Sequence, residues 1–184
     1  MNSNLQIISG KWRGKKLHLP PNARPTQNKA RIALFNMLDG ILATSDCRLA
    51  TIWDAFAGSG AFGIEFLSRG AQKAIFTDTD AESIKTIKKN LAGLDAARAA
   101  VALTDATGAI KKYGADADII FIDPPYAHPE LGARFIEKLS AAAKPGAIIV
   151  WEMEKDFAPA PLPENLKILK DKTYGRARFL IISN

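Results

Sequence analysis

The residues best suited to chemistry follow an apolar run, in the stretch ADIIFIDPPYAHP (residues 117–129). Because Pro124 and Pro125 cannot donate hydrogen bonds to a sheet, the strand predicted by the apolar run must end there, at an edge. The Asp123 carboxylate and the Pro124 carbonyl are hydrogen-bond acceptors displayed at that edge, and Tyr126 adds an aromatic ring. This DPPY tetrapeptide predicts a functional site; a simple strand end with an exposed aromatic is the alternative.

A second candidate site is the glycine-rich loop DAFAGSGAFG (residues 54–63). Gly58 and Gly60 match the pattern of dinucleotide-binding loops, and Asp78 follows at roughly the spacing of an acid that binds a ribose diol. Asp54 separates two interpretations, because a carboxylate repels a pyrophosphate but attracts the sulfonium and ammonium groups of S-adenosylmethionine. We therefore favour S-adenosylmethionine, with a nicotinamide oxidoreductase as the alternative.

Asp105 is a third acid that ends an apolar run, AAVALTD (residues 99–105). It could accept a hydrogen bond from an adenine amino group. Together with Asp54 and Asp78 it would lie at one edge of a parallel sheet, where open α/β sheets bind ligands. A helix N-cap is the alternative role for each acid taken singly.

Alternating apolar runs and helical patterns from residue 49 onward must position these acids. Strands are expected at residues 49–55, 73–78, 99–105, 117–123 and 146–152, and helices at 64–68, 81–94, 107–113 and 129–142. This alternation predicts an α/β fold with a mostly parallel, doubly wound sheet. Residues 166–172 and 177–183 flank a short turn and predict a closing antiparallel hairpin at one edge.

The first 42 residues have a different character. LQIISG and KKLHL flank KWRG and predict a two-stranded ribbon, and an amphipathic helix is expected at residues 28–42. Residues 1–38 contain no acid and seven basic residues: Lys11, Arg13, Lys15, Lys16, Arg24, Lys29 and Arg31. The net charge of the whole chain is +6, so this segment holds all of the excess. Such one-sided charge is typical of a polyanion-binding surface, although an unused basic surface is the alternative. Trp12 could stack on a nucleobase or pack against the sheet.

Length and composition favour a single domain over residues 1–184, with the ribbon and helix (1–42) appended to a core (49–184). No apolar run approaches the roughly 18 residues that span a bilayer, and no signal peptide is visible, so we expect a soluble cytoplasmic protein. The lone Cys47 can form no internal disulfide and has no second thiol for a metal site. We expect a monomer without a metal.

Four stretches together resemble the bacterial RsmD family, the guanine-N2 methyltransferases of small-subunit ribosomal RNA: IISGKWRGKKL, RPTQNKARIALFNML, DAFAGSGAFGIEFLSRGA and FIDPPY. The resemblance covers most of the chain and implies a Rossmann-like class I methyltransferase. It implies S-adenosylmethionine as cofactor and ribosomal RNA, or the small ribosomal subunit, as partner. The implied cofactor residues are Asp54, Phe56, Gly58, Gly60, Asp78 and Asp105, and the implied catalytic residues are Asp123, Pro124, Pro125 and Tyr126. In that role the Asp123 carboxylate and the Pro124 carbonyl would each accept an N–H bond of the target amine and aim its lone pair at the methyl group, and Tyr126 would stack on the base. The chain departs from the family pattern at Ile32, where a Glu is typical.

Two other functions stay open at this point. Adenine-N6 methylation of DNA or RNA is one, because the DPPY tetrapeptide binds an amine without specifying its ring. A non-catalytic RNA-binding module on a methyltransferase fold is the other. For either methylation, the target base must be unpaired or flipped out of a helix to reach the tetrapeptide.

Overall fold

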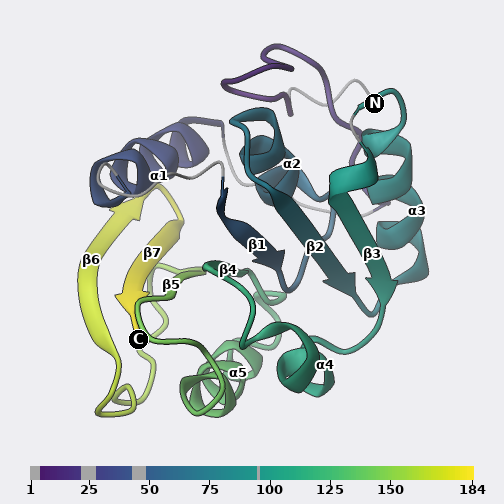
Figure 1. Cartoon of the computed structure of the whole chain (residues 1–184). Helices are drawn as coiled ribbons and strands as arrows, with labels where there is room; N and C mark the ends of the chain where they lie inside the picture. Colours follow the sequence, from purple (N-terminus) through teal and green to yellow (C-terminus); the bar gives the residue numbers. More distant parts are fainter. Residues whose placement is uncertain (1–4, 22–27, 43–48, 95) are drawn as a thin grey trace.

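A seven-stranded sheet forms the centre of the computed structural model, which describes residues 5–21, 28–42, 49–94 and 96–184 (Figure 1). Its strand order is β3-β2-β1-β4-β5-β7-β6. The parallel strands are β1 (Thr51–Asp54), β2 (Lys73–Asp78), β3 (Ala99–Leu103), β4 (Ile119–Ile122) and β5 (Ile148–Glu154). The antiparallel hairpin consists of β6 (Lys167–Tyr174) and β7 (Ala177–Ser183). The predicted parallel sheet and its closing hairpin are confirmed.

Helices cover both faces of this sheet. They are α1 (Asn28–Ile41), α2 (Ala61–Ser68), α3 (Ala81–Leu91), α4 (Ala106–Tyr113) and α5 (Glu130–Ser140), with a short 3₁₀ turn, η2 (Ala96–Arg98). One apolar cluster joins α1, α2 and α3 to the sheet, and a second joins α4 and α5 to its other face. Figure 1 shows the two groups on opposite sides. In the described parts of the chain, no helix is long and apolar enough to cross a membrane.

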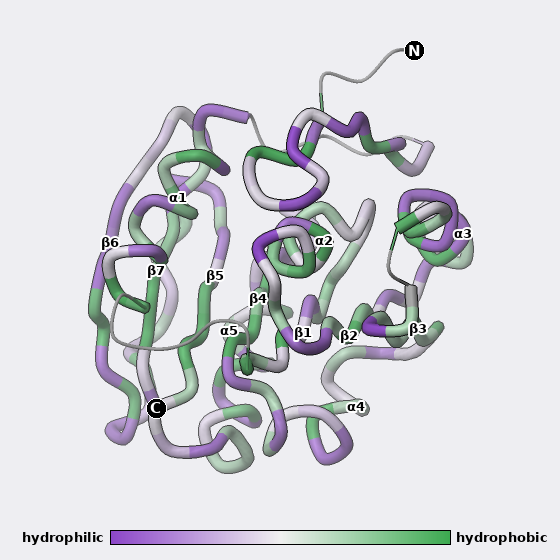
Figure 2. Tube along the Cα trace, turned by 45° about the horizontal axis from the view of Figure 1, so that its top comes forward, coloured by the Kyte–Doolittle hydropathy of each residue, from purple (hydrophilic) through white to green (hydrophobic). Residues whose placement is uncertain are grey.

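The hairpin closes the sheet with strands of unlike character. β5 is almost wholly buried, whereas β6 is mostly exposed and carries four charged residues in KILKDKTY. Figure 2 shows this change from a hydrophobic to a more hydrophilic strand. Charged side chains on an edge strand oppose pairing with another chain, so β6 protects this end of the sheet.

The N-terminal segment (residues 5–21) contains less strand pairing than the predicted two-stranded ribbon. The predicted ribbon is reduced to one isolated bridge, Gln6 with Lys16, and a few neighbouring backbone hydrogen bonds. The backbone N–H groups of Ile8 and Ser9, which a longer ribbon would need, instead donate to the carboxylate of Glu65 in α2. The segment thus lies along α2, above it in Figure 1, rather than as a free-standing ribbon.

Candidate active site at the carboxyl edge of the sheet

The predicted acids meet where the parallel strands end. Asp54 is the last residue of β1 and Asp78 the last of β2, while Asp123 directly follows β4. β1 pairs with both β2 and β4, so these three ends are neighbours. Asp105 lies beyond β3 and caps α4, its carboxylate accepting the Gly108 N–H at 2.7 Å. The structure therefore brings all four acids to one edge.

The glycine-rich loop is fastened to two of these acids. Gly58 donates its N–H to Asp78 at 2.8 Å, and Gly63 donates its N–H to Asp54 at 3.1 Å. Gly60 has a left-handed φ of 74°, which lets α2 begin immediately after the turn, three residues earlier than predicted. The acids thus fix the loop whose backbone would face a ligand.

Phe56 and Asn90 support the same loop from two sides. The Phe56 ring packs on Phe135 of α5, with 5.6 Å between ring centroids. The buried Asn90 of α3 donates to the Ser59 carbonyl in the loop and exchanges two hydrogen bonds with the backbone of His18. Asn90 therefore joins the loop to the N-terminal segment. The sequence analysis missed this link, because nothing in a helical pattern marks an amide as a tertiary bridge.

Two carboxyl groups of the site have perturbed pKa values. Burial raises the pKa of Asp54 to about 8, and the Asp78 charge adds to this against the hydrogen bond from Gly63. Desolvation of its carboxyl group also raises the pKa of Asp123 well above its ordinary value, and the negative charges of Glu152 and Asp54 raise it further. Perturbed carboxyl groups of this kind cluster at functional sites.

Glu152 is a buried acid that the sequence analysis did not select. It lies in β5 with 2% of its surface exposed. Its carboxylate accepts a hydrogen bond from the Tyr126 hydroxyl at 3.3 Å, and its charge helps to raise the pKa of that hydroxyl. The signal was present, because Glu152 ends the apolar run GAIIVWE just as the selected acids end theirs.

The DPPY tetrapeptide borders a cavity of about 200 Å³. Pro124 and Tyr126 line one side of it, and Trp151, Glu152 and Phe157 line another. Pro125 is exposed, and Tyr126 has 38% of its surface exposed, so its ring is accessible for stacking. Among the described residues, no group of three or more His, Cys, Asp or Glu side chains could hold a metal ion.

Most of the predicted RNA-binding residues that the structure describes are on the surface. Lys11, Arg13, Lys16 and Lys29 are exposed. Lys15 is half-buried and donates to the Ala92 carbonyl at 3.1 Å. Arg24 and Cys47 lie outside the described residues. Trp12 packs against the core, and the Arg98 guanidinium lies 5.9 Å from its ring centroid.

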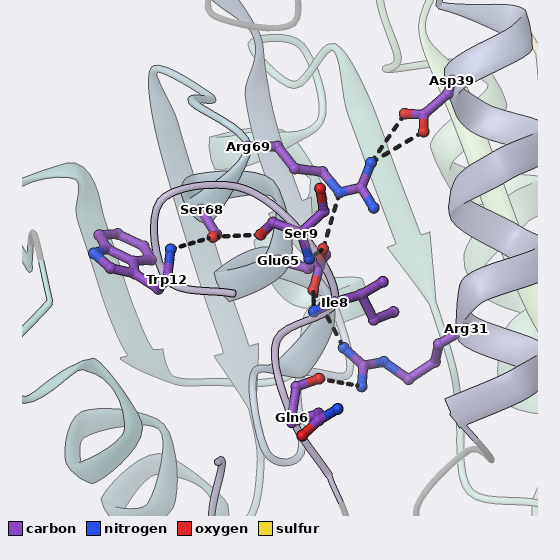
Figure 3. A network of polar contacts seen from close by, with 9 residues as sticks. All are labelled: Gln6, Ile8, Ser9, Trp12, Arg31, Asp39, Glu65, Ser68 and Arg69. Atoms are coloured by element: carbon purple, nitrogen blue, oxygen red, sulfur yellow. Dashed lines mark hydrogen bonds and ion pairs between the residues drawn. The ribbon is translucent and has the colours of Figure 1, made fainter. Parts of the chain in front are cut away.

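The prediction for Arg31 needs correction. Its side chain is buried, and its guanidinium lies 3.7 Å from Glu65 and donates to the Gln6 carbonyl at 3.1 Å (Figure 3). Burial lowers its pKa, opposed chiefly by the Glu65 charge. Arg31 therefore holds the N-terminal segment in place and is absent from the exposed basic surface.

Glu65 is the centre of the polar network drawn in Figure 3. Fully buried in α2, it accepts hydrogen bonds from the backbone of Ile8 and Ser9 and from the Arg69 side chain. One turn further on, the Ser68 hydroxyl donates to the Ser9 carbonyl and accepts the Trp12 N–H. Since α2 begins at the glycine-rich loop, this network ties the basic residues to the candidate active site.

Comparison with known proteins identifies the family. The family model described as "Conserved hypothetical protein 95" matches residues 5–183. Ribosomal RNA small subunit methyltransferase D of Escherichia coli K12 is 33% identical, over 97% of this chain and 89% of its own. The enzyme of that name from Haemophilus influenzae is 36% identical, over 98% and 94%. The solved structure of a putative methyltransferase from Escherichia coli is similar with a TM-score of 0.80 at 33% identity, covering 97% of this chain and 96% of its own. The chain belongs to the ribosomal RNA small subunit methyltransferase D family.

Proposed function

We propose that this protein transfers a methyl group from S-adenosylmethionine to the exocyclic N2 amine of an unpaired guanine in small-subunit ribosomal RNA. Membership of the family supports methylation of ribosomal RNA, because relatives with that name match nearly the whole chain. One observation carries the chemistry: β4, which leads into the DPPY tetrapeptide, pairs directly with β1, which leads into the glycine-rich loop. An amine acceptor and a cofactor loop are thus adjacent.

The acids around the glycine-rich loop fit a cationic nucleoside. A buried Asp54 with a raised pKa is stabilised in its ionised form by a positive ligand, which a dinucleotide pyrophosphate cannot provide. Asp78 and Asp105 would accept hydrogen bonds from the ribose diol and the adenine amine, as the family resemblance implies. When bound, S-adenosylmethionine supplies an electrophilic methyl group. The chain's own residues would bind this cofactor and orient the target amine toward its methyl group.

The DPPY tetrapeptide is suited to hold the target amine. The Asp123 carboxylate and the rigid Pro124 carbonyl would accept its two N–H bonds, and the exposed Tyr126 ring would stack on the base. An amine that gains a methyl group must lose a proton. The raised pKa of Asp123 suits its carboxylate to take that proton.

The exposed basic residues of the N-terminal segment support binding of the RNA backbone. Lys11, Arg13 and Lys16 lie on one short stretch, and this stretch is anchored on α2. Contacts of this kind position a nucleic acid without specifying its sequence. Arg24, in the same basic part of the sequence, belongs to this proposal as well.

The test is to incubate the protein with labelled methyl donor and ribosomal RNA from cells that lack the enzyme, and then to digest the RNA to nucleosides. We expect the label in N2-methylguanosine. Label in N6-methyladenosine would favour the adenine alternative. RNA binding without any transfer, in naked RNA and in small-subunit particles, would favour a non-catalytic module.

A further inference from the structure

Glu152 and Asp123 form a pair of acids on neighbouring strands. β4 and β5 are parallel, with Ile122 opposite Trp151. Extending this register by one residue places Asp123, which directly follows β4, opposite Glu152. Opposed residues of a parallel pair point to the same face of the sheet. The electrostatic effect of Glu152 on the pKa of Asp123 is consistent with this closeness. Two acceptor groups therefore stand side by side where the target base is proposed to bind.

A cavity lined by Glu152 and by Pro124, the residue after Asp123, is of a size suited to a single base. Its volume of about 200 Å³ is below the roughly 300–1,000 Å³ of pockets for drug-sized ligands. Tyr126 and Glu152 both line it, and the Tyr126 hydroxyl is bonded to Glu152 Oε1. A base stacked on the Tyr126 ring therefore has one edge close to the Glu152 carboxylate. A carboxylate can accept several hydrogen bonds at once, about four on its two oxygens, so accepting from Tyr126 is compatible with accepting from a base.

The two purines present opposite patterns to a pair of carboxylates. Guanine has two donors side by side, the ring N1–H and the exocyclic N2 amine. Adenine has a donor, its N6 amine, beside an acceptor, its ring N1. An ionised carboxylate can only accept hydrogen bonds, so guanine satisfies both acids, whereas adenine leaves one buried charge facing a lone pair.

We infer that Glu152 is a specificity residue, whose carboxylate accepts the N1–H of the target guanine while Asp123 accepts its N2 amine. The inference rests on the proposed function and deepens it. It explains how an amine-binding tetrapeptide that does not itself specify a ring acts on guanine. Neither the tetrapeptide nor the glycine-rich loop supplies this discrimination.

The experiment replaces the mapped target guanine in synthetic small-subunit RNA with 2-aminopurine. This base keeps the 2-amine but has an acceptor at N1 in place of the N–H. Single-turnover rates are measured on both RNAs with wild type and Glu152→Gln. Wild type should prefer guanine by about 10- to 100-fold, the effect of one buried charged hydrogen bond. In Glu152→Gln the preference should fall to within a few-fold of one, because the amide can donate to the N1 acceptor.

Glu137→Gln is the matched control. Glu137 is exposed in α5 and is not among the residues that line the cavity, so the change removes the same charge without touching the inferred contact. It should keep the wild-type preference. If Glu152→Gln is poorly folded by thermal melting, Glu152→Asp supplies the second test: it retains the charge but withdraws the carboxylate, and should lower the preference while S-adenosylmethionine affinity stays near wild type.

The outcomes separate this inference from the proposed function. No transfer to guanine by wild type would overturn the proposed function itself. Normal wild-type transfer, with an unchanged preference in Glu152→Gln or Glu152→Asp, would overturn only the role of Glu152. An equal loss of preference in Glu137→Gln would do the same, because it would show a general effect of charge.

Discussion

Asp54 is a fully buried carboxyl group and Asp123 a partly buried one, and both lie where a cation and an amine are proposed to bind. Burial favours their protonated forms, as the raised pKa values show. A positive ligand and an amine that becomes positive during the reaction both favour ionisation. Ionising these two carboxyl groups is therefore unfavourable in the free protein and becomes favourable in the proposed reacting complex.

Asp54 gives the stability of the free protein a pH dependence. Its pKa is about 8 in the folded protein against an ordinary 3.8, so between these values the folded state holds a proton that the unfolded chain has released. The free energy of unfolding should therefore fall as pH rises across this range, with a slope of up to about 1.4 kcal/mol per pH unit. Thermal melts of wild type and Asp54→Asn should show a smaller slope in the variant, with a remainder from Asp123. Equal slopes would contradict the assignment.

Asp123 is expected to act on the substrate amine and not on the methyl donor. Asp123→Ala should lower single-turnover methylation by about 10²- to 10⁴-fold, the usual contribution of a group that positions and deprotonates. Calorimetry should find S-adenosylmethionine affinity little changed. Asp116→Ala, which removes an exposed acid just before β4, is the control and should be near wild type. Near-normal turnover of Asp123→Ala would remove the residue from its proposed role.

Much of the candidate site could be predicted residue by residue, because strand-end acids are visible in sequence. Asp54, Asp78 and Asp123 each end an apolar run, and parallel strands bring such ends together. Glu152 ends a run too, but its value depends on β5 lying next to β4. That neighbour relation is a property of the strand order, which no local pattern encodes.

At the scale of elements, α2 connects the two halves of the proposed function. It begins at Ala61, within the glycine-rich stretch, and its buried Glu65 and Ser68 hold the N-terminal segment. Gly10 approaches this helix so closely that a Cβ there would lie 2.0 Å from the Ser68 carbonyl oxygen. The basic stretch is therefore seated on the helix in one position.

Removing the charge of Glu65 should destabilise the protein strongly. Glu65→Gln leaves the buried Arg31 without its ionic partner, and breaking a buried pair costs about 3–5 kcal/mol of unfolding free energy. Denaturant unfolding measures the loss. Glu82→Gln, which breaks the exposed pair with Lys85, should change stability by less than about 1 kcal/mol. Similar losses in the two variants would show that the Glu65 network is not a structural anchor.

The error on Arg31 has a clear physical cause. Counting charge treats every basic side chain as exposed, but Arg31 precedes Leu34, Phe35 and Leu38 by three, four and seven residues. That spacing puts it on the buried face of α1, as the structure shows. The helical pattern predicted that Arg31 is buried, whereas the charge count treated it as exposed. The ribbon is shorter than predicted for a related reason. The backbone N–H groups of Ile8 and Ser9 donate to Glu65, which is far away in sequence.

At the scale of the whole molecule, the residues proposed to bind RNA and those proposed to bind the cofactor lie in different parts of the fold. Arg13→Ala combined with Lys16→Ala should weaken RNA binding and lower the slope of log affinity against log salt by about one or two units, since each phosphate contact releases counterions. S-adenosylmethionine affinity should not change. RNA titrations at several salt concentrations provide the measurement.

Lys170→Ala combined with Lys172→Ala is the control for this experiment. It removes two exposed charges from the edge strand β6 and should leave the salt slope unchanged. An equal fall in slope for both pairs would indicate that RNA responds to overall charge and not to the N-terminal segment.

The fold class could be predicted from the alternation of apolar runs and helical patterns. The strand order could not, because it is fixed by packing between segments that are distant in sequence.

The attachment of the N-terminal segment to α2 sets an order of events during synthesis. Ile8 bonds to Glu65, which comes 57 positions later, and His18 bonds to Asn90, which comes 72 positions later. At a ribosomal rate of about 5–20 residues per second, those partners appear roughly 3–14 s after the segment itself. The basic segment is thus translated well before the residues that hold it. It can acquire its folded shape only after the glycine-rich loop, α2 and α3 have been translated.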